Sequence, residues 1–266
     1  MLFPQLGFGT FRIKGQQITD LVEEALDTGY RHIDTAQFYE NEADIGKALA
    51  TTSVARDDYW VTTKVWYEKL KHQDVLDSLK QSRDNLQVDT IDMALIHWPS
   101  PDGVPLKESL DALMEAREQK LIGHFGVSNF TTQLMQQSID HVGADNIATN
   151  QIELHPFLQN QKVCDFCDQH DISVTAYMPL AVGKVMEDAT IKRIAADHDA
   201  SAAQVALAWL MHHNRVVIPS TTKVSHLHSN FKAQQLSLSE DEVVAIDKLD
   251  RNDRIVDPDF APDWDE

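Results

Sequence analysis

The sequence predicts an α/β protein folded as a single (α/β)8 TIM barrel over residues 1–266. Short apolar runs alternate with amphipathic helical segments, and this pattern is typical of parallel strands joined by crossover helices. The length of 266 residues is close to the roughly 250 residues of a typical eight-stranded barrel. No shift of composition and no linker divides the chain, so we expect one domain.

Eight segments are candidate strands. In chain order they are residues 6–10, 31–34, 60–64, 93–97, 125–128, 148–151, 174–177 and 216–219. Parallel strands of a barrel end around one mouth, and the active sites of such barrels lie on that face. Polar residues stand at or next to the carboxyl ends of all segments but the first: Asp34, Lys64, His97, Ser128, Gln151, Tyr177 and Ser220.

The segments between the strands carry helix signals. Four apolar residues repeat at helical spacing in one of them: Val75, Leu76, Leu79 and Leu86. Ser201 and Gln204 form a capping box before an apolar run. Asp20 and Glu23 predict the start of the first helix, and Gly29 predicts its end.

The charge of the chain limits its partners. A formal net charge of −19 and a pI near 4.9 argue against nucleic acid or an anionic membrane surface as a partner. The first residues lack a basic segment followed by an unbroken apolar stretch, and no later run approaches a membrane span. We therefore expect a cytoplasmic protein, and we expect it to be a monomer.

We expect no metal site. Cys164 and Cys167 form a Cys-x-x-Cys within a helical segment, where residues three apart share a face. Two helix thiols are the favoured interpretation over a redox or zinc site, since a structural zinc needs four ligands. The histidines at 212–213 and 226–228 also lie on helical segments and predict surface or hydrogen-bonded side chains.

Four residues suit an acid catalyst: Asp34, Tyr39, Lys64 and His97. A tyrosine with a pKa near ~10 donates its proton at neutral pH only beside a group that stabilises the phenolate, and a lysine supplies that charge. An aspartate holds the lysine, and an imidazole donates a hydrogen bond to an oxygen that gains negative charge. Each residue alone is more often an ordinary polar group, but their joint position favours reduction of a carbonyl.

Reduction needs a hydride source, yet the usual dinucleotide fingerprint is absent. Gly7-Phe8-Gly9 lacks the third glycine, so a tight strand or turn is the favoured interpretation. Barrels often bind phosphate at the loops after the last strands and at a nearby helix start. Ile-Pro-Ser-Thr-Thr-Lys at 218–223 fits that place, although a plain helix cap explains it equally well.

A flat heterocycle also has candidate contacts. Tyr177 can present its ring face, and Ser128, Asn129 and Gln151 can hydrogen-bond to an amide. A tyrosine at such a position is more often a core residue. Only its shared position with the other strand-end residues favours the functional interpretation.

Several motifs occur in one order along the chain: Gly-Phe-Gly-Thr-Phe, Asp-Thr-Ala-Gln-Phe-Tyr-x-Asn-Glu, Thr-Thr-Lys-Val-Trp, Leu-Ile-His-Trp-Pro, Gly-Val-Ser-Asn-Phe, Asn-Gln-Ile-Glu-Leu-His-Pro and Ala-Tyr-Met-Pro-Leu. With them the chain resembles the aldo-keto reductases over essentially its whole length. The resemblance implies an (α/β)8 barrel that binds NADPH, with Tyr39 as proton donor and Lys64 lowering its pKa. It also implies that Asp34 holds Lys64 and that His97 orients the carbonyl.

The same resemblance implies two sets of binding residues. The cofactor-binding set is Thr10, Asp34, Ser128, Asn129, Gln151, Tyr177, Leu180, Ser220, Thr221, Thr222, Lys223 and Asn230. The substrate-binding set is Phe11, Tyr39, Trp66, His97 and Trp98, with Trp264 as a further candidate wall.

The chain departs from the family pattern in the last loop. The common form has Ile-Pro-Lys-Ser, a later Arg and then Glu-Asn; these positions here are Ser220, Thr221, His226, Ser229 and Asn230. Lys223 can replace the lost charge, so we expect NADPH, with NADH as the alternative. Met178 stands where a serine is usual, and the short loop before Leu106 and the short tail after Arg251 predict an open mouth.

We therefore expect NADPH-dependent reduction of aldehydes and ketones, the partner being a small-molecule carbonyl substrate. The expected classes are small aldehydes, α-ketoaldehydes such as methylglyoxal, and keto sugar acids such as 2,5-diketo-D-gluconate. The alternative is a nucleotide-binding regulatory or structural barrel with little turnover. A metal-dependent barrel hydrolase is the third hypothesis, and the sequence offers it no convincing ligand cluster.

Overall fold

In the computed structural model, which describes residues 2–265, one parallel sheet contains eight strands in chain order. The strands are β1 (Phe8–Gly9), β2 (His32–Asp34), β3 (Trp60–Val65), β4 (Ile91–Ile96), β5 (Ile122–Ser128), β6 (Ile147–Glu153), β7 (Ser173–Tyr177) and β8 (Val216–Val217). The sheet closes on itself because Gly7 donates to the Val217 carbonyl and the Val217 amide donates to Gln5, both at 2.8 Å. The predicted (α/β)8 barrel is confirmed.

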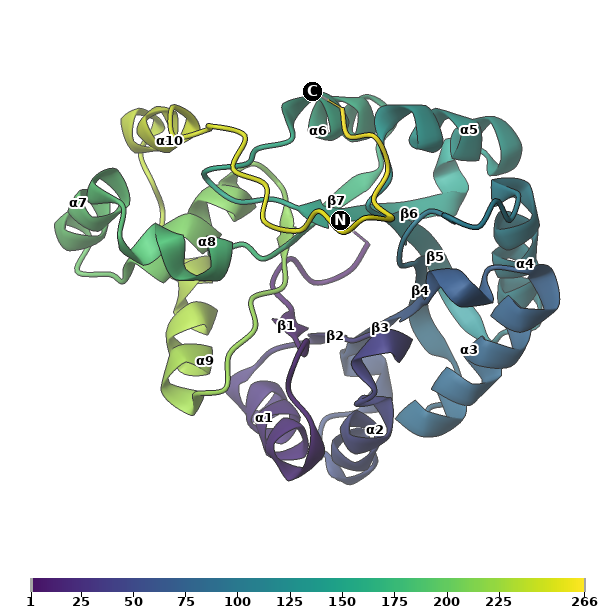
Figure 1. Cartoon of the computed structure of the whole chain (residues 1–266). Coiled ribbons are helices and arrows are strands. Elements are labelled where there is room, and N and C mark those ends of the chain that lie inside the picture. The colour runs from purple at the N-terminus through teal and green to yellow at the C-terminus, as the bar shows by residue number, and fades with distance from the viewer. Residues whose placement is uncertain (1, 266) are drawn as a thin grey trace.

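Helices surround this sheet (Figure 1). They are α1 (Gly15–Thr28), α2 (Glu42–Thr51), α3 (His72–Leu86), α4 (Leu106–Glu118), α5 (Thr132–Val142), α6 (Gln161–Gln169), α7 (Ala189–Asp197), α8 (Ala202–His212), α9 (Val224–Phe231) and α10 (Glu240–Asp247). Their apolar faces bury strand residues such as Ile33, Val61 and Val174. This burial of apolar area is the main force that holds helices to sheet.

Two of the helix predictions are confirmed. The four apolar residues of α3 that repeat at helical spacing are buried. Ser201 and Gln204 form a complete capping box at the start of α8, each side chain bonded to the backbone of the other.

The predicted start of the first helix is wrong. The helix α1 begins at Gly15, and Asp20 and Glu23 lie inside it. A residue of another helix caps α1, because the Gly15 amide donates to the Asp44 carboxylate of α2 at 2.9 Å. Gly29 ends the helix as expected, with a left-handed φ of 115°.

Gly9 brings the two ends of the sheet together. Its amide donates to the Pro219 carbonyl at 3.0 Å, and a Cβ on Gly9 would overlap the carbonyl of Ile218. Only glycine permits this approach, which agrees with the tight-strand interpretation of Gly7-Phe8-Gly9. Ile218 and Pro219, the first residues of the 218–223 segment, are thereby held beside the end of β1.

Candidate active site

The four candidate catalytic residues come from four neighbouring places at the carboxyl ends of the strands. Asp34 ends β2, Lys64 lies near the end of β3 and His97 follows β4. Tyr39 ends the short 3₁₀ helix Gln37–Tyr39 that follows β2. Barrel closure therefore brings together side chains that are up to 63 positions apart, since 97 − 34 = 63.

Lys64 is the centre of the group. It is fully buried, and its ammonium donates to Asp34 Oδ1 at 2.5 Å, to the Thr35 carbonyl at 2.8 Å and to the Tyr39 hydroxyl at 3.2 Å. Burial alone would lower the pKa of Lys64, but the charges of Asp34 and Tyr39 and the hydrogen bonds to both together outweigh burial, and the pKa is raised. Lys64 is thus a permanent cation beside the tyrosine.

Two opposed effects act on Tyr39. Burial raises the pKa of its hydroxyl, while the charge of Lys64 and its hydrogen bond lower it, and the net pKa lies above the usual 10.0. The expected direction of the Lys64 effect is therefore present, but burial outweighs it. Tyr39 is a protonated hydroxyl at neutral pH whose conjugate base has a cation in contact.

His97 is neutral at physiological pH. Burial, and then the charge of Lys64, hold the pKa of its imidazole well below 6.5. Its ring lies edge-on to Tyr39, with 5.7 Å between ring centroids. Within residues 2–265 its Nδ1 is buried without a hydrogen-bond partner. A neutral imidazole has one N–H to donate, and the His97 ring lies beside the ring of Tyr39.

The residues expected to bind an amide are linked to this group by hydrogen bonds. Gln151 Nε2 donates to Asp34 Oδ2 at 2.8 Å, and the Ser128 hydroxyl donates to the Gln151 carbonyl at 2.8 Å. Asn129 donates to the His97 carbonyl at 3.0 Å and accepts from the Tyr177 hydroxyl at 2.8 Å.

Tyr177 and Thr10 take different positions around these residues. Tyr177 is only half-buried, so it is not the plain core residue of the alternative interpretation. Thr10 is buried and donates to the Asp34 carbonyl at 3.0 Å. Both are therefore tied to the strand-end residues that surround Lys64.

The expected phosphate-binding residues lie at the start of α9. Ser220, Thr222 and Lys223 are exposed. Lys223 precedes the first helical residue, and no side chain caps the helix. A plain N-cap therefore does not explain these residues, and the first amides of α9 face outward from an uncapped end. Of the remaining expected contacts, Asn230 is buried in the last turn and Leu180 is half-buried after β7.

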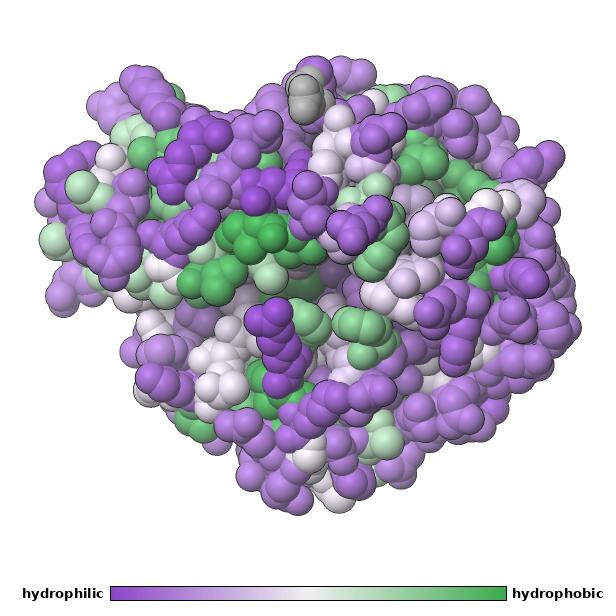
Figure 2. Space-filling view, viewed as in Figure 1, coloured by the Kyte–Doolittle hydropathy of each residue, from purple (hydrophilic) through white to green (hydrophobic). Residues whose placement is uncertain are grey.

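Aromatic rings form one side of the site, a group we call the aromatic wall: Phe11, Phe38, Trp66, Tyr67, Trp98 and Phe260. Phe11 packs on Tyr39 at 4.9 Å, and Trp66 lies edge-on to His97 at 5.2 Å. Trp98 is buried against Phe260 and Trp264. Figure 2 looks onto this end of the barrel and shows a hollow near its centre, bordered by hydrophobic residues.

Sequence reasoning missed three members of the aromatic wall: Phe38, Phe260 and Tyr67, which packs on both Trp66 and Phe260. Phe38 stacks on Trp66 with 4.0 Å between centroids, and its position next to Tyr39 was the available signal. Phe260 reaches Trp66, at 6.0 Å, from the tail of the chain. The tail therefore forms part of the aromatic wall at the barrel mouth. Its short length predicts instead a mouth that is open on this side.

The remaining predicted positions lie away from this site. Cys164 and Cys167 are free, buried thiols in α6, and burial raises the pKa of each to about 12. No three His, Cys, Asp or Glu side chains of residues 2–265 gather as metal ligands would. None of the helices in the same residues is long and apolar enough to cross a membrane.

Comparisons with known proteins agree with this geometry. The model of the Aldo/keto reductase family matches residues 5–251. The chain is 50% identical to Methylglyoxal reductase DkgB of Escherichia coli O157:H7 over 100% of both chains. It is 36% identical to the 9,11-endoperoxide prostaglandin H2 reductase of Trypanosoma cruzi, covering 99% of this chain and 94% of that one.

Solved structures agree as well. The sequence motifs also indicate a likeness to bacterial 2,5-diketo-D-gluconate reductase B. A crystal structure of a proposed 2,5-diketo-D-gluconic acid reductase B superposes with a TM-score of 0.96 at 38% identity, covering 99% of this chain and 94% of that one. The chain therefore belongs to the aldo/keto reductase family, and it is an oxidoreductase that reduces carbonyl groups of small substrates with a nicotinamide cofactor.

Proposed function

We propose that this enzyme reduces small aldehydes and α-ketoaldehydes to alcohols with NADPH, and that Tyr39 is the proton donor. One observation carries the proposal: the Tyr39 hydroxyl, the Lys64 ammonium and the Asp34 carboxylate form a chain of hydrogen bonds at the barrel mouth, buried at Lys64 and Asp34 and partly exposed at Tyr39. Such a chain can give a proton to a carbonyl oxygen and stabilise the phenolate that remains.

Each of the four residues then has one task. Tyr39 gives its proton to the substrate oxygen as negative charge develops there. Lys64, held by Asp34, stabilises the resulting phenolate at a distance of 3.2 Å. His97, neutral because of its low pKa, donates its single N–H to the same oxygen and orients the carbonyl.

The hydrogen-bonding side chains next to the catalytic residues suit a nicotinamide cofactor. Ser128, Asn129 and Gln151 present hydroxyl and amide groups that suit a carboxamide, and Tyr177 is a half-buried aromatic beside them. The cofactor, when bound, supplies the hydride. The uncapped start of α9 suits a phosphate because backbone amides and the helix dipole favour negative charge.

The preference for NADPH rests on Lys223. The exposed side chain stands at the start of α9, next to three hydroxyl residues, in a chain of net charge −19 that otherwise repels phosphate. A single exposed cation is weaker than the lysine and arginine of the common family pattern. NADH is the alternative cofactor.

The substrate class rests on the relatives and on the aromatic wall. Four relatives that are 48% to 50% identical are methylglyoxal reductases by name. Keto sugar acids such as 2,5-diketo-D-gluconate are the second class, by the likeness to the proposed reductase B. Apolar walls discriminate by only ~1 to 3 kcal/mol per methylene, so we expect a broad range of substrates.

A panel of carbonyl substrates, assayed with NADPH and NADH side by side, tests reaction, cofactor and substrate class together. We expect oxidation of NADPH with methylglyoxal and a lower kcat/KM with NADH. Equal or better turnover with NADH contradicts the cofactor preference. Saturable cofactor binding without oxidation by any carbonyl favours the alternative of a regulatory or structural barrel. The cytoplasmic, monomeric state belongs to the same proposal, and sedimentation equilibrium tests the monomer.

A further inference from the structure

The tail of the chain crosses the mouth of the barrel without secondary structure of its own. Residues 251–265 contain no helix or strand, and Figure 1 shows this yellow segment running across the end of the barrel. A segment without regular secondary structure has few internal hydrogen bonds and is ordered mainly by contacts with the rest of the protein. Two consecutive tail amides bond to one buried side chain, Glu153.

Glu153 is the last residue of β6, and its side chain is fully buried. Its two carboxylate oxygens accept from two consecutive tail amides, Ile255 N at 2.9 Å and Val256 N at 2.7 Å. A third bond comes from His155 Nε2 at 2.9 Å. The Phe157 amide donates to His155 Nδ1, so Nε2 carries the proton and is the donor to Glu153.

This arrangement couples the barrel to the tail. A buried carboxylate is tolerated only when its oxygens are hydrogen-bonded, and two of its three partners here are tail amides. Release of the tail therefore leaves a buried charge with a single partner. The released tail amides bond to water instead, so the cost of opening lies with the buried Glu153 carboxylate.

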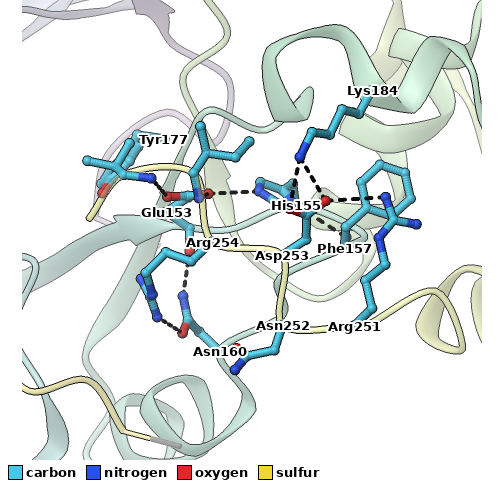
Figure 3. A network of polar contacts seen from close by, with 12 residues as sticks. Glu153, His155, Phe157, Asn160, Tyr177, Lys184, Arg251, Asn252, Asp253 and Arg254 are labelled. Atoms are coloured by element: carbon cyan, nitrogen blue, oxygen red, sulfur yellow. Dashed lines mark hydrogen bonds and ion pairs between the residues drawn. The ribbon is translucent and has the colours of Figure 1, made fainter. Parts of the chain in front are cut away.

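Further contacts fix the tail on either side of this point (Figure 3). Asp253 forms an ion pair with Lys184 through both oxygens at 2.8 Å. Arg254 donates to Asn160 at 3.0 Å, and Asn160 donates to the Glu153 carbonyl at 2.6 Å. These pairs are more exposed than Glu153, and exposed pairs contribute little.

The other end of the tail is held across the mouth. The Asp265 carboxylate accepts from the amide and the hydroxyl of Thr132, at 2.7 and 2.8 Å, at the start of α5. Phe260 lies between the two anchors. Its ring contacts Trp66, Tyr67 and Trp98 of the aromatic wall, with centroid distances of 6.0, 4.7 and 5.4 Å.

We propose that Glu153 is a positioning residue for the substrate site: by holding residues 255–256 it places Phe260 against Trp66, which in turn lies against His97. This inference rests on the proposed function, because it takes the pocket beside His97 as the substrate site. Glu153 does not touch the reacting atoms. It determines how tightly the pocket holds a bulky carbonyl substrate, and it leaves the chemistry at Tyr39 unchanged.

Glu153→Gln is the first test variant. It keeps the volume of the side chain but turns one of the two acceptors into a donor that faces a tail amide. We expect KM for phenylglyoxal to rise about tenfold, the size of one lost aromatic contact, with kcat and the NADPH KM within about twofold. For methylglyoxal, which is smaller and has no ring to pack on Phe260, we expect KM to change less.

Two further variants separate positioning from folding. Val256→Pro removes one tail donor and leaves the barrel interior unchanged, and we expect the same rise in KM. Phe260→Ala removes the ring that the tail carries. If Glu153 acts through Phe260, the double variant Glu153→Gln with Phe260→Ala has the KM of either single variant, whereas independent effects multiply. Multiplied effects, or an unchanged phenylglyoxal KM in both tail variants, overturn the proposal.

Limited digestion with trypsin tests the attachment of the tail without an enzyme assay. Cleavage after Arg254 releases residues 255–266, and intact mass reports it. We expect faster release in Glu153→Gln and Val256→Pro than in the wild type, and equal rates contradict the anchor. A wild type that reduces no carbonyl overturns the proposed function, while the cleavage rates still decide whether Glu153 holds the tail.

Discussion

The ammonium of Lys64 lies 3.2 Å from the hydroxyl of Tyr39, and Lys64 has no exposed surface. A charge that water does not screen acts at full strength on its neighbour. Burial opposes ionisation of Tyr39, so the hydroxyl keeps its proton until a substrate oxygen takes it. At that moment the cation stabilises the new phenolate, and the two residues act as one acid.

Replacement of Tyr39 by Phe should abolish turnover. The variant keeps the ring that packs on Phe11 and His97 and removes only the proton donor. We expect kcat to fall by about 10² to 10⁴, the usual contribution of a general acid, with an unchanged Kd for NADPH by fluorescence titration. Tyr59→Phe, far from the mouth at the start of β3, is the matched control. If kcat of Tyr39→Phe is close to that of the wild type, Tyr39 is not the proton donor.

Replacement of Lys64 by Met should cost stability as well as activity. It leaves the buried Asp34 without its counter-ion, and breaking one partner of a buried pair typically costs about 3 to 5 kcal/mol. The double variant Lys64→Met with Asp34→Asn removes both charges and should recover part of that free energy of unfolding, while remaining inactive. Urea denaturation of the three proteins measures this. A double variant no more stable than the single one argues against a charged pair.

His32 should make stability depend on pH. It is fully buried inside the barrel beneath Lys64, and burial is the main reason that its pKa falls to about 4. In the unfolded chain the imidazole binds a proton below about 6.5. Between these two values the unfolded state binds more protons, so stability is complete above pH 6.5 and is lost as the pH falls toward 4.

The size of this effect can be measured against a variant. A shift from 6.5 to about 4 corresponds to about 3 kcal/mol at 1.36 kcal/mol per unit. His32→Leu should therefore show a smaller loss of unfolding free energy than the wild type between pH 6.5 and 4, by urea denaturation at each pH. His226→Leu, which removes an exposed histidine, should keep the wild-type slope. An unchanged slope in His32→Leu refutes the prediction.

Residues whose neighbours are fixed by barrel topology could be predicted from the sequence. Asp34, Lys64 and His97 end apolar runs, and parallel strands must bring such ends together. The apolar runs predict all eight strands for the same reason. Tyr39 lies outside a strand, but it follows Asp34 by only five residues, since 39 − 34 = 5.

Residues positioned by tertiary contacts could not be predicted in this way. Glu153 looks like a loop residue, because a charge after Ile152 breaks the apolar pattern, yet β6 continues through it. Phe260 belongs to a segment with no periodicity, and the Glu153 carboxylate decides where that segment lies. The start of α1 likewise depends on Asp44, an acceptor in another helix.

Lys223 should determine the choice between the two nicotinamide cofactors. Its side chain is exposed at the start of α9, where a cation can pair with the extra phosphate that distinguishes NADPH from NADH. We expect Lys223→Ala to raise KM for NADPH about three- to tenfold, the range of one exposed charge-assisted contact, and to leave KM for NADH unchanged.

Lys232→Ala is the matched control, because it removes the same charge from an exposed side chain at the opposite end of the same helix. It changes the net charge equally but should leave both KM values as they are. Added salt should narrow the gap between wild type and Lys223→Ala, since exposed charges are screened within about 10 Å at 0.1 M ionic strength. Equal effects of the two lysine variants would mean that net charge, and not a contact at the start of α9, attracts the phosphate.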